Sequence, residues 1–312
     1  MPRLVPLPSE FADRPFSVSE ARDRGIAHTR LSSDDLARPF HGVRRPVVVT
    51  RSTDDFDGGV NPLLLETCRA YAALGRLDAF SHSTAAELFG VPLPARLRYR
   101  DGEPVHVTVA GAARGRQGAG VIGHTRNRLD TVDRHGVTAI APPLTWLDLA
   151  PRLNREELVT MADAMVSGIH PLCTIDELTR IASTPRARGV RKAREALELV
   201  RVGVESPQET ALRLAIVDAA LPEPSIQFAI HDSQDEFVAR VDLAYPVHRI
   251  AIEYEGDLHR SDRSIWRKDI TRHDRLEDLG WRMIRVTIDD LVPSPVALIG
   301  RIRRARAATF TL

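Results

Sequence analysis

The C-terminal third of the chain has the clearest alternation of apolar and polar positions. Residues 236–246 and 248–256 alternate with a period of two, which predicts two strands joined by a short turn. Residues 281–291 repeat the pattern and predict a third strand. Helical periodicity before, between and after these strands predicts the order α-β-β-α-β-α for residues 205–312.

The helix that opens this region has clear end signals. Ser206 suits the N-cap, Pro207 the first helical position, and Glu209 follows three residues after the cap. The sequence Pro-Glu-Pro at residues 222–224 ends the helix. A second, amphipathic helix is predicted at residues 261–280.

The first 55 residues predict two short helices followed by a hairpin. Residues 16–25 and 27–37 read as the helices, and residues 39–50 as the hairpin or wing. This order is compatible with a winged helix-turn-helix, whose second helix enters the major groove of DNA. A small α/β subdomain that contacts only protein fits the same pattern.

The middle region, residues 56–204, predicts alternating helices and strands, among them apolar helices at residues 156–166 and 175–182, with no chemical signature. Ser83, His82 and His124 suggest a hydrolase, but a serine before a helical run is more simply an N-cap, so we favour the structural role. The basic cluster between Arg186 and Arg194 fits a solvated helix face better than a phosphate site.

Length and composition restrict the number of domains and the class of protein, but they do not indicate a function. A chain of 312 residues is expected to form two or three domains. Its formal net charge of +1 does not by itself indicate nucleic acid. Cys68 and Cys173 have no metal-ligand spacing, and no apolar stretch approaches the roughly 20 residues that span a bilayer. We therefore expect a soluble, cytoplasmic protein without a membrane partner.

Glu253 and Glu255 are the strongest candidates for chemistry. Side chains two apart on a strand share a face, so these glutamates lie together. If Ala244 faces Arg249 in the hairpin, Asp242 falls opposite Ala251 on that same face. Three neighbouring carboxylates raise one another's pKa values or require a cation, and oxygen ligands suit Mg²⁺ or Mn²⁺. Such an ion activates water and stabilises charge on a scissile phosphate.

Further residues fit this interpretation, and one alternative competes with it. Glu209 from the preceding helix is a fourth acid within reach, and His259 returns a ring towards the strand end. Alternatively, Glu253 and Glu255 form a solvated face paired with the arginines of a helix at residues 263–275. The spacing leaves both possibilities open, and Asp242 on the same face favours the acidic site.

Three segments carry a family resemblance: "ESPQETALRLAIVDAALPEP", "RVDLAYPVHRIAIEYEGDLHR" and "DRLEDLGWRMIRVTIDDL". Together they resemble the Vsr-like (very-short-patch-repair-like) endonuclease domain found at the C-terminus of actinobacterial proteins, which has a PD-(D/E)XK nuclease fold. The resemblance covers about the last 105 residues. It implies that Asp242 binds metal, that Glu253 is the next acid, and that Glu209 and His259 support them.

The sequence departs from that superfamily at Glu255, where a lysine is usual. Glu255 is then a further ligand or a residue that orients water. Lys268 and His259 are candidates for the missing positive charge, and Lys268 is also a candidate for DNA contact.

The rest of the chain is similar to AbiEi-type antitoxins of abortive-infection systems. "FSVSEARDRGIAHTRL" and "PFHGVRR" are similar to their winged-helix N-terminus, and "SHSTAAELFGVPLP" and "LTWLDLA" recur in that architecture. The resemblance implies a DNA-binding region with Arg30, Arg44 and Arg45 as contacts.

These expectations together describe a mixed α/β (α+β) protein with three parts. They are a winged-helix region at 1–55, an AbiEi-like α/β domain at 56–204, and the endonuclease-like domain at 205–312. The expected function is DNA binding with Mg²⁺-dependent cleavage, in phage defence or repair, in a homodimer or beside a toxin partner. The alternative is a non-enzymatic transcriptional regulator or antitoxin with a degenerate nuclease-like tail.

Overall fold

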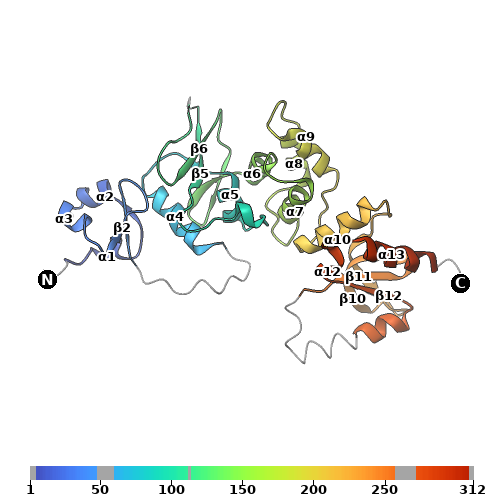
Figure 1. The fold of residues 1–312 in the computed structure, drawn as a ribbon. Coiled ribbons are helices and arrows are strands. Elements are labelled where there is room, and N and C mark those ends of the chain that lie inside the picture. Colours follow the sequence, from blue (N-terminus) through green and yellow to red (C-terminus); the bar gives the residue numbers. More distant parts are fainter. Residues whose placement is uncertain (1–4, 48–59, 112–113, 257–271, 309–312) are drawn as a thin grey trace. The chain divides into compact units, whose positions relative to one another are not determined.

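The computed structural model describes residues 5–47, 60–111, 114–256 and 272–308 (Figure 1). The chain divides into two compact units, Met1–Arg152 with Glu177–Ala193, and Leu153–Asp176 with Arg194–Leu312. These units do not follow the predicted boundaries at residues 55 and 204. Both are mixed α/β, as expected, and each is described by itself.

The N-terminal part of the first unit is a small helical cluster beside a three-stranded antiparallel sheet of order β1-β3-β2. Its elements are α1 (Ser9–Ala12), β1 (Phe16–Ser17), α2 (Val18–Asp23), α3 (His28–Leu31), β2 (Leu36–Ala37) and β3 (Val43–Pro46). Phe11, Phe16 and Leu31 are buried at its centre. The predicted helix at 27–37 is wrong in its second half, where Leu36 and Ala37 pair with β3 instead.

The middle part of the first unit is built on a five-stranded mixed sheet of order β6-β5-β4-β8-β7. Its elements are α4 (Pro62–Ala72), β4 (Ala79–Phe80), α5 (His82–Phe89), η1 (Ala95–Leu97), β5 (Val105–Ala110), β6 (Val121–Arg126), β7 (Thr131–Arg134), β8 (Val137–Ile140) and α6 (Pro142–Leu149). Ser83 is not the N-cap that we predicted. Ser81 occupies that position, and Ser83 lies inside α5.

Helices α8 (Ile175–Ala182) and α9 (Val190–Leu197) each contain residues from both units. The bounds of α8 confirm the helix predicted there. Among the described residues, we found no helix with the length and apolar character needed to cross a membrane.

The second unit contains a four-stranded sheet of order β12-β11-β10-β9, with helices on both faces. Its elements are α7 (Arg155–Val166), α10 (Pro207–Asp218), β9 (Ser225–His231), β10 (Phe237–Tyr245), η2 (Pro246–His248), β11 (Ile250–Tyr254), β12 (Arg282–Val286), α12 (Ile288–Leu291) and α13 (Val296–Ala308). Residues 272–278 are also helical. Strand β9 was missing from the predicted order. Ser206 caps α10 as predicted, because its side chain accepts the Glu209 backbone N–H at 3.1 Å.

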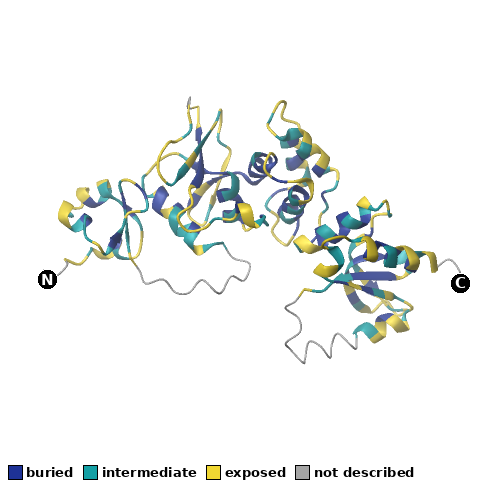
Figure 2. Ribbon diagram, in the orientation of Figure 1, coloured by how far each residue is buried: buried dark blue, intermediate teal, exposed yellow. Residues whose placement is uncertain are grey.

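The central strands of this sheet are buried on both faces (Figure 2). On one face, Ile250 and Ile252 pack with α10 and α13 through Leu212 and Leu298. On the other, Ala251 packs with Leu276 of the helical segment 272–278. The acidic residues of β10 and β11 therefore have to lie near the rims of a covered sheet.

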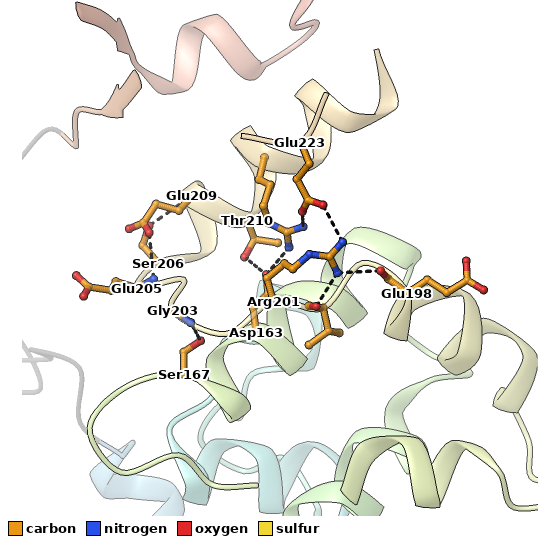
Figure 3. A network of polar contacts seen from close by, with 12 residues as sticks. Asp163, Ser167, Glu198, Arg201, Gly203, Glu205, Ser206, Glu209, Thr210 and Glu223 are labelled. Atoms are coloured by element: carbon orange, nitrogen blue, oxygen red, sulfur yellow. Dashed lines mark hydrogen bonds and ion pairs between the residues drawn. The ribbon is translucent and has the colours of Figure 1, made fainter. Parts of the chain in front are cut away.

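A buried ion pair joins α7 to α10. Arg213 Nη2 donates to Asp163 Oδ2 at 2.7 Å, and the two side chains are 0% and 1% exposed. The Thr210 hydroxyl donates to the same oxygen at 2.9 Å, and the Arg201 backbone N–H donates to Oδ1 at 2.7 Å. Glu223 accepts from both arginines, which extends the network shown in Figure 3. Residues 153–176 therefore belong structurally with the C-terminal unit.

We expect Asp163→Asn to lower the free energy of unfolding by about 3–5 kcal/mol, because it leaves the buried Arg213 charge poorly compensated. Arg155→Gln is the matched control, since Arg155 forms an exposed pair with Asp218 on the same two helices. It should cost no more than about 1 kcal/mol. Urea unfolding of both variants measures the difference, and equal costs would contradict a structural role for the buried pair.

Candidate acidic site

Asp242 lies near the middle of the carboxylate group. Its Oδ2 accepts the Tyr254 backbone N–H at 2.8 Å. Strands β10 and β11 pair with Ala244 opposite Ala251, not opposite Arg249, so the predicted register was wrong by two residues. Continuing the observed pairing sets Asp242 beside Glu253. Because the register differs from the predicted one by an even number of residues, Asp242 and Glu253 still lie on the same face of the sheet.

The pKa of Asp242 is raised to about 6. Burial is the largest cause, and the negative charges of Glu209, Glu253 and Glu205 add to it, while the Tyr254 N–H opposes it. This electrostatic coupling shows that acids from α10, β10 and β11 face a common region. It is the pattern expected of like charges assembled in a partly buried setting.

Glu253 is bound by an arginine. Arg272 donates from both terminal nitrogens to the two Glu253 oxygens at 2.8 and 2.9 Å. The Glu253 side chain is only 13% exposed. A two-pronged contact of this kind is among the stronger ion-pair geometries, and it is the arginine pairing that the sequence left open as an alternative.

Glu209 and Glu255 have different surroundings. Glu209 is buried on α10, and its Oε2 accepts the Glu205 backbone N–H and the Gln227 amide at 3.0 and 2.9 Å. Glu255 directly follows β11 and contacts Arg285 Nε at 3.1 Å, with both side chains about half exposed. Glu255 thus pairs towards β12.

Among the described residues, these acids do not bring three potential ligand atoms within 4.8 Å of one another. The group that does so consists of three histidines. Two predicted site residues, His259 and Lys268, lie outside the described residues. Of the predicted site residues, Asp242, Glu253 and Glu209 lie near enough for their charges to interact. Glu253 is in addition ion-paired with Arg272.

The three arginines predicted to contact DNA all have partners within the first unit. Arg30 binds both oxygens of Asp35 at 2.8 and 2.9 Å, and its side chain is 10% exposed. Arg44 Nε donates to the Leu31 carbonyl at 2.5 Å, and Arg45 pairs with Glu66. These contacts support the local fold and occupy groups that we expected to reach phosphate.

Sequence reasoning missed the histidine group. His82 and His124 had been weighed as part of a hydrolase set, but His106 had not been singled out. His82 and His106 lie 24 positions apart along the chain, and the three rings meet because β5 pairs with β6 and the start of α5 is hydrogen-bonded to β5 at His106. No local spacing signalled this site.

Replacing Asp242 should stabilise the protein in a pH-dependent way. Since the folded-state pKa is about 6, above the usual 3.8, the folded state holds this proton more tightly, and stability falls as pH rises between these values. Asp242→Asn should therefore match wild type below about pH 4 and exceed it by up to about 3 kcal/mol above pH 6. Urea midpoints in EDTA measure this, with the exposed Asp235→Asn as control. A constant difference across pH would contradict the assigned cause.

The chain is 32% identical over 283 residues to the uncharacterized protein MT2308 of Mycobacterium tuberculosis strain CDC 1551 / Oshkosh. That match covers 88% of this chain and 94% of the relative. The uncharacterized protein Rv2248 of strain ATCC 25618 / H37Rv matches with the same identity and coverage. No family model matches, and no solved structure does. The chain belongs to the same family as these two mycobacterial proteins.

Proposed function

We propose that the second unit hydrolyses DNA phosphodiester bonds with Mg²⁺ or Mn²⁺ at Asp242 and Glu253, supported by Glu209. The observation that carries this proposal is the pairing of β10 with β11, which sets Asp242 beside Glu253, with the buried Glu209 of α10 near enough for its charge to raise the pKa of Asp242. Three separate elements supply these acids, which is costly for the fold unless the charges serve a purpose.

The order of elements supports a PD-(D/E)XK-like core. Helix α10 is followed by β9, β10 and β11, then by the helical segment 272–278 and β12. Strand β12 pairs parallel to β11, while β9, β10 and β11 pair antiparallel. The resemblance assigns the site to Asp242, Glu253 and Glu209, and their location on β10, β11 and α10 supports the proposal.

The residues present fit a hard divalent cation. Asp242 and Glu253 offer carboxylate oxygens, the donors that Mg²⁺ prefers, and the site is only partly buried. A bound ion would supply activated water and stabilise charge on the phosphate. Glu209 holds the backbone at Glu205 and adds negative potential at Asp242.

In this proposal Arg272 binds Glu253 in the free protein and a DNA phosphate in the complex. Its guanidinium now neutralises Glu253, and the same planar fork suits a phosphate group. DNA and a cation would together replace the ion pair, with Arg272 turning to phosphate and Glu253 to the metal. Glu255 remains with Arg285 and is assigned no essential role.

The second candidate is the non-enzymatic regulator or antitoxin. The ion pairs of Glu253 with Arg272 and of Glu255 with Arg285 favour it, because they compensate the acids without a cation. In both candidates, the winged-helix-like N-terminal part supplies DNA affinity, through exposed groups such as Arg38 rather than the paired Arg30. The two candidates differ in whether phosphodiester bonds are broken.

Plasmid cleavage in Mn²⁺ separates the two candidates. Wild type and Asp235→Asn should nick or cut DNA, whereas Asp242→Asn and Glu253→Gln should fall to background because each removes a proposed metal ligand. Urea midpoints confirm that each variant is folded. A wild type that never cleaves under any divalent ion, or an Asp242→Asn variant that cleaves as fast, would leave the regulator as the function.

Removing Arg272 tests whether the acids bind the ion. Arg272→Gln removes the guanidinium that competes with Mn²⁺ for Glu253, so the affinity for Mn²⁺ should rise by about fivefold or more. Arg282→Gln, on the exposed edge of β12, is the matched control and should leave it unchanged. Isothermal titration measures both. Unaltered Mn²⁺ binding in Arg272→Gln would show that Glu253 is not a ligand.

A further inference from the structure

Three histidines meet in the first unit, on elements that the proposed nuclease chemistry does not use. His82 begins α5, His106 lies on β5 and His124 on β6 (Figure 1). One ligand nitrogen from each lies within 4.8 Å of the other two. We call these residues the histidine cluster.

The backbone holds the cluster together. Strands β5 and β6 run parallel with Thr108 opposite His124, so His106, two positions earlier, shares the face of His124. The His106 carbonyl accepts the Ser81 N–H at 3.0 Å, and the His106 N–H donates to Thr84 Oγ1 at 2.9 Å. The start of α5 is thereby tied directly to β5.

His82 adopts a backbone conformation that is uncommon for a residue with a side chain. Its φ is +52°, in the left-handed region. This conformation costs about 1–3 kcal/mol, and such strain gathers at functional sites. Here it accompanies a ring stacked on His124 with centroids 3.6 Å apart.

The cluster is a polar region inside a packed domain. His106 is 8% exposed, while Ser81, Thr84 and Thr108 are 0%, 3% and 2% exposed. His106 Nδ1 and His124 Nε2 are 2.9 Å apart and form a hydrogen bond, and Ser81 Oγ lies at hydrogen-bond distance, 3.1 Å, from His82 Nδ1. Thr108 Oγ1, on the same face of the sheet, is buried without a hydrogen-bond partner. This unsatisfied hydroxyl, on the strand face that carries His106 and His124, lacks the partner that a buried polar group normally has.

The rings are held in the form that binds metals. Burial lowers the pKa of His82 to about 2 and that of His106 to about 4, with the neighbouring histidines adding to the effect, and it also lowers that of His124. Neutral imidazole, with a free lone pair, is the ligand form.

We propose that His82, His106 and His124 form a three-histidine site for a first-row transition metal, Zn²⁺ in the simplest case, with a fourth coordination position open. Imidazole nitrogens suit Zn²⁺ and do not suit Mg²⁺, which prefers oxygen. This site is therefore chemically distinct from the acidic site and independent of it.

Binding requires a small rearrangement of the side chains. The ring planes of His106 and His124 are within 11° of parallel, whereas lone pairs must converge on one ion. Rotation about the soft terminal torsion of each imidazole achieves this, and nitrogens about 3.3 Å apart satisfy tetrahedral Zn–N bonds. The hydrogen between the two rings moves to the outer nitrogen of its own ring, so no net proton is released.

Nearby arginines select what fills the open position. The charge of Arg152 acts on all three histidines, and that of Arg126 on His82. Arg126 is paired with Asp148, whereas Arg152 is exposed. The positive surroundings weaken a bare dication and favour an anion as fourth ligand, such as hydroxide or inorganic phosphate.

Metal titration of the 312-residue chain without an affinity tag tests the proposal. After treatment with EDTA, wild type should take up one equivalent of Zn²⁺, and excess Zn²⁺ should raise Tm by about 5 °C at 100 times Kd. Co²⁺ should give the visible absorption of a four-coordinate site. Inorganic phosphate should change that spectrum if an anion occupies the open position.

Two ligand variants, one control variant and one charge variant test the site. His106→Gln and His124→Gln should weaken Zn²⁺ binding at least about 100-fold, whereas His135→Asn, in the exposed turn between β7 and β8, should not. Arg152→Gln should strengthen binding by about two- to fivefold, as expected for removal of one screened charge.

Several outcomes would overturn the site. They are no uptake of Zn²⁺ by wild type, unchanged binding in His124→Gln, or a Co²⁺ spectrum without tetrahedral character. His124 is partly exposed, so its variant is informative even if His106→Gln fails to fold. Asp242→Asn should leave Zn²⁺ uptake intact, which keeps this test separate from the nuclease proposal.

Discussion

The second unit depends on the buried pair of Asp163 with Arg213. Both charges are removed from water, and burial raises the pKa of Asp163 against the lowering influence of Arg213. The pair is tolerated because Thr210 and Arg201 donate further hydrogen bonds to Asp163 and Glu223 accepts one from Arg213 (Figure 3), although Arg213 Nε is buried without a partner. Arg213 and Glu209 lie four residues apart on one helix, so the anchor that seats α10 also sets the position of Glu209.

The acids of the sheet show how a fold compensates like charges. Asp242 has a backbone donor, Glu209 has a backbone and an amide donor, and Glu253 has a bidentate arginine. The pKa of Asp242 rises because its carboxylate is largely buried and lies near the negative charges of Glu209 and Glu253, with one backbone donor opposing the rise. A cation and an arginine both relieve the same repulsion, and the proposed function requires that they exchange.

The two proposed metal sites differ in donor chemistry. The second unit offers carboxylate oxygens near a sheet rim, and the first offers neutral imidazoles in a buried polar region. Hard cations select the former and borderline-soft cations the latter. One chain can therefore hold two different ions without competition between the sites.

The sequence by itself determined what depends on neighbouring residues. The N-cap of α10, the limits of α8 and the shared face of Asp242 and Glu253 follow from local spacing, and the structure confirms Ser206 as the cap and the bounds of α8. Strand β9 was not predicted, although Ile226, Phe228 and Ile230 recur at every second position along it. The tertiary structure decided the register, since the turn at Pro246–His248 leaves Arg249 unpaired with β10 and sets Tyr245 opposite Ile250. It also decided that Arg272 meets Glu253 and that three distant histidines meet one another, because such contacts depend on chain pairing and not on periodicity.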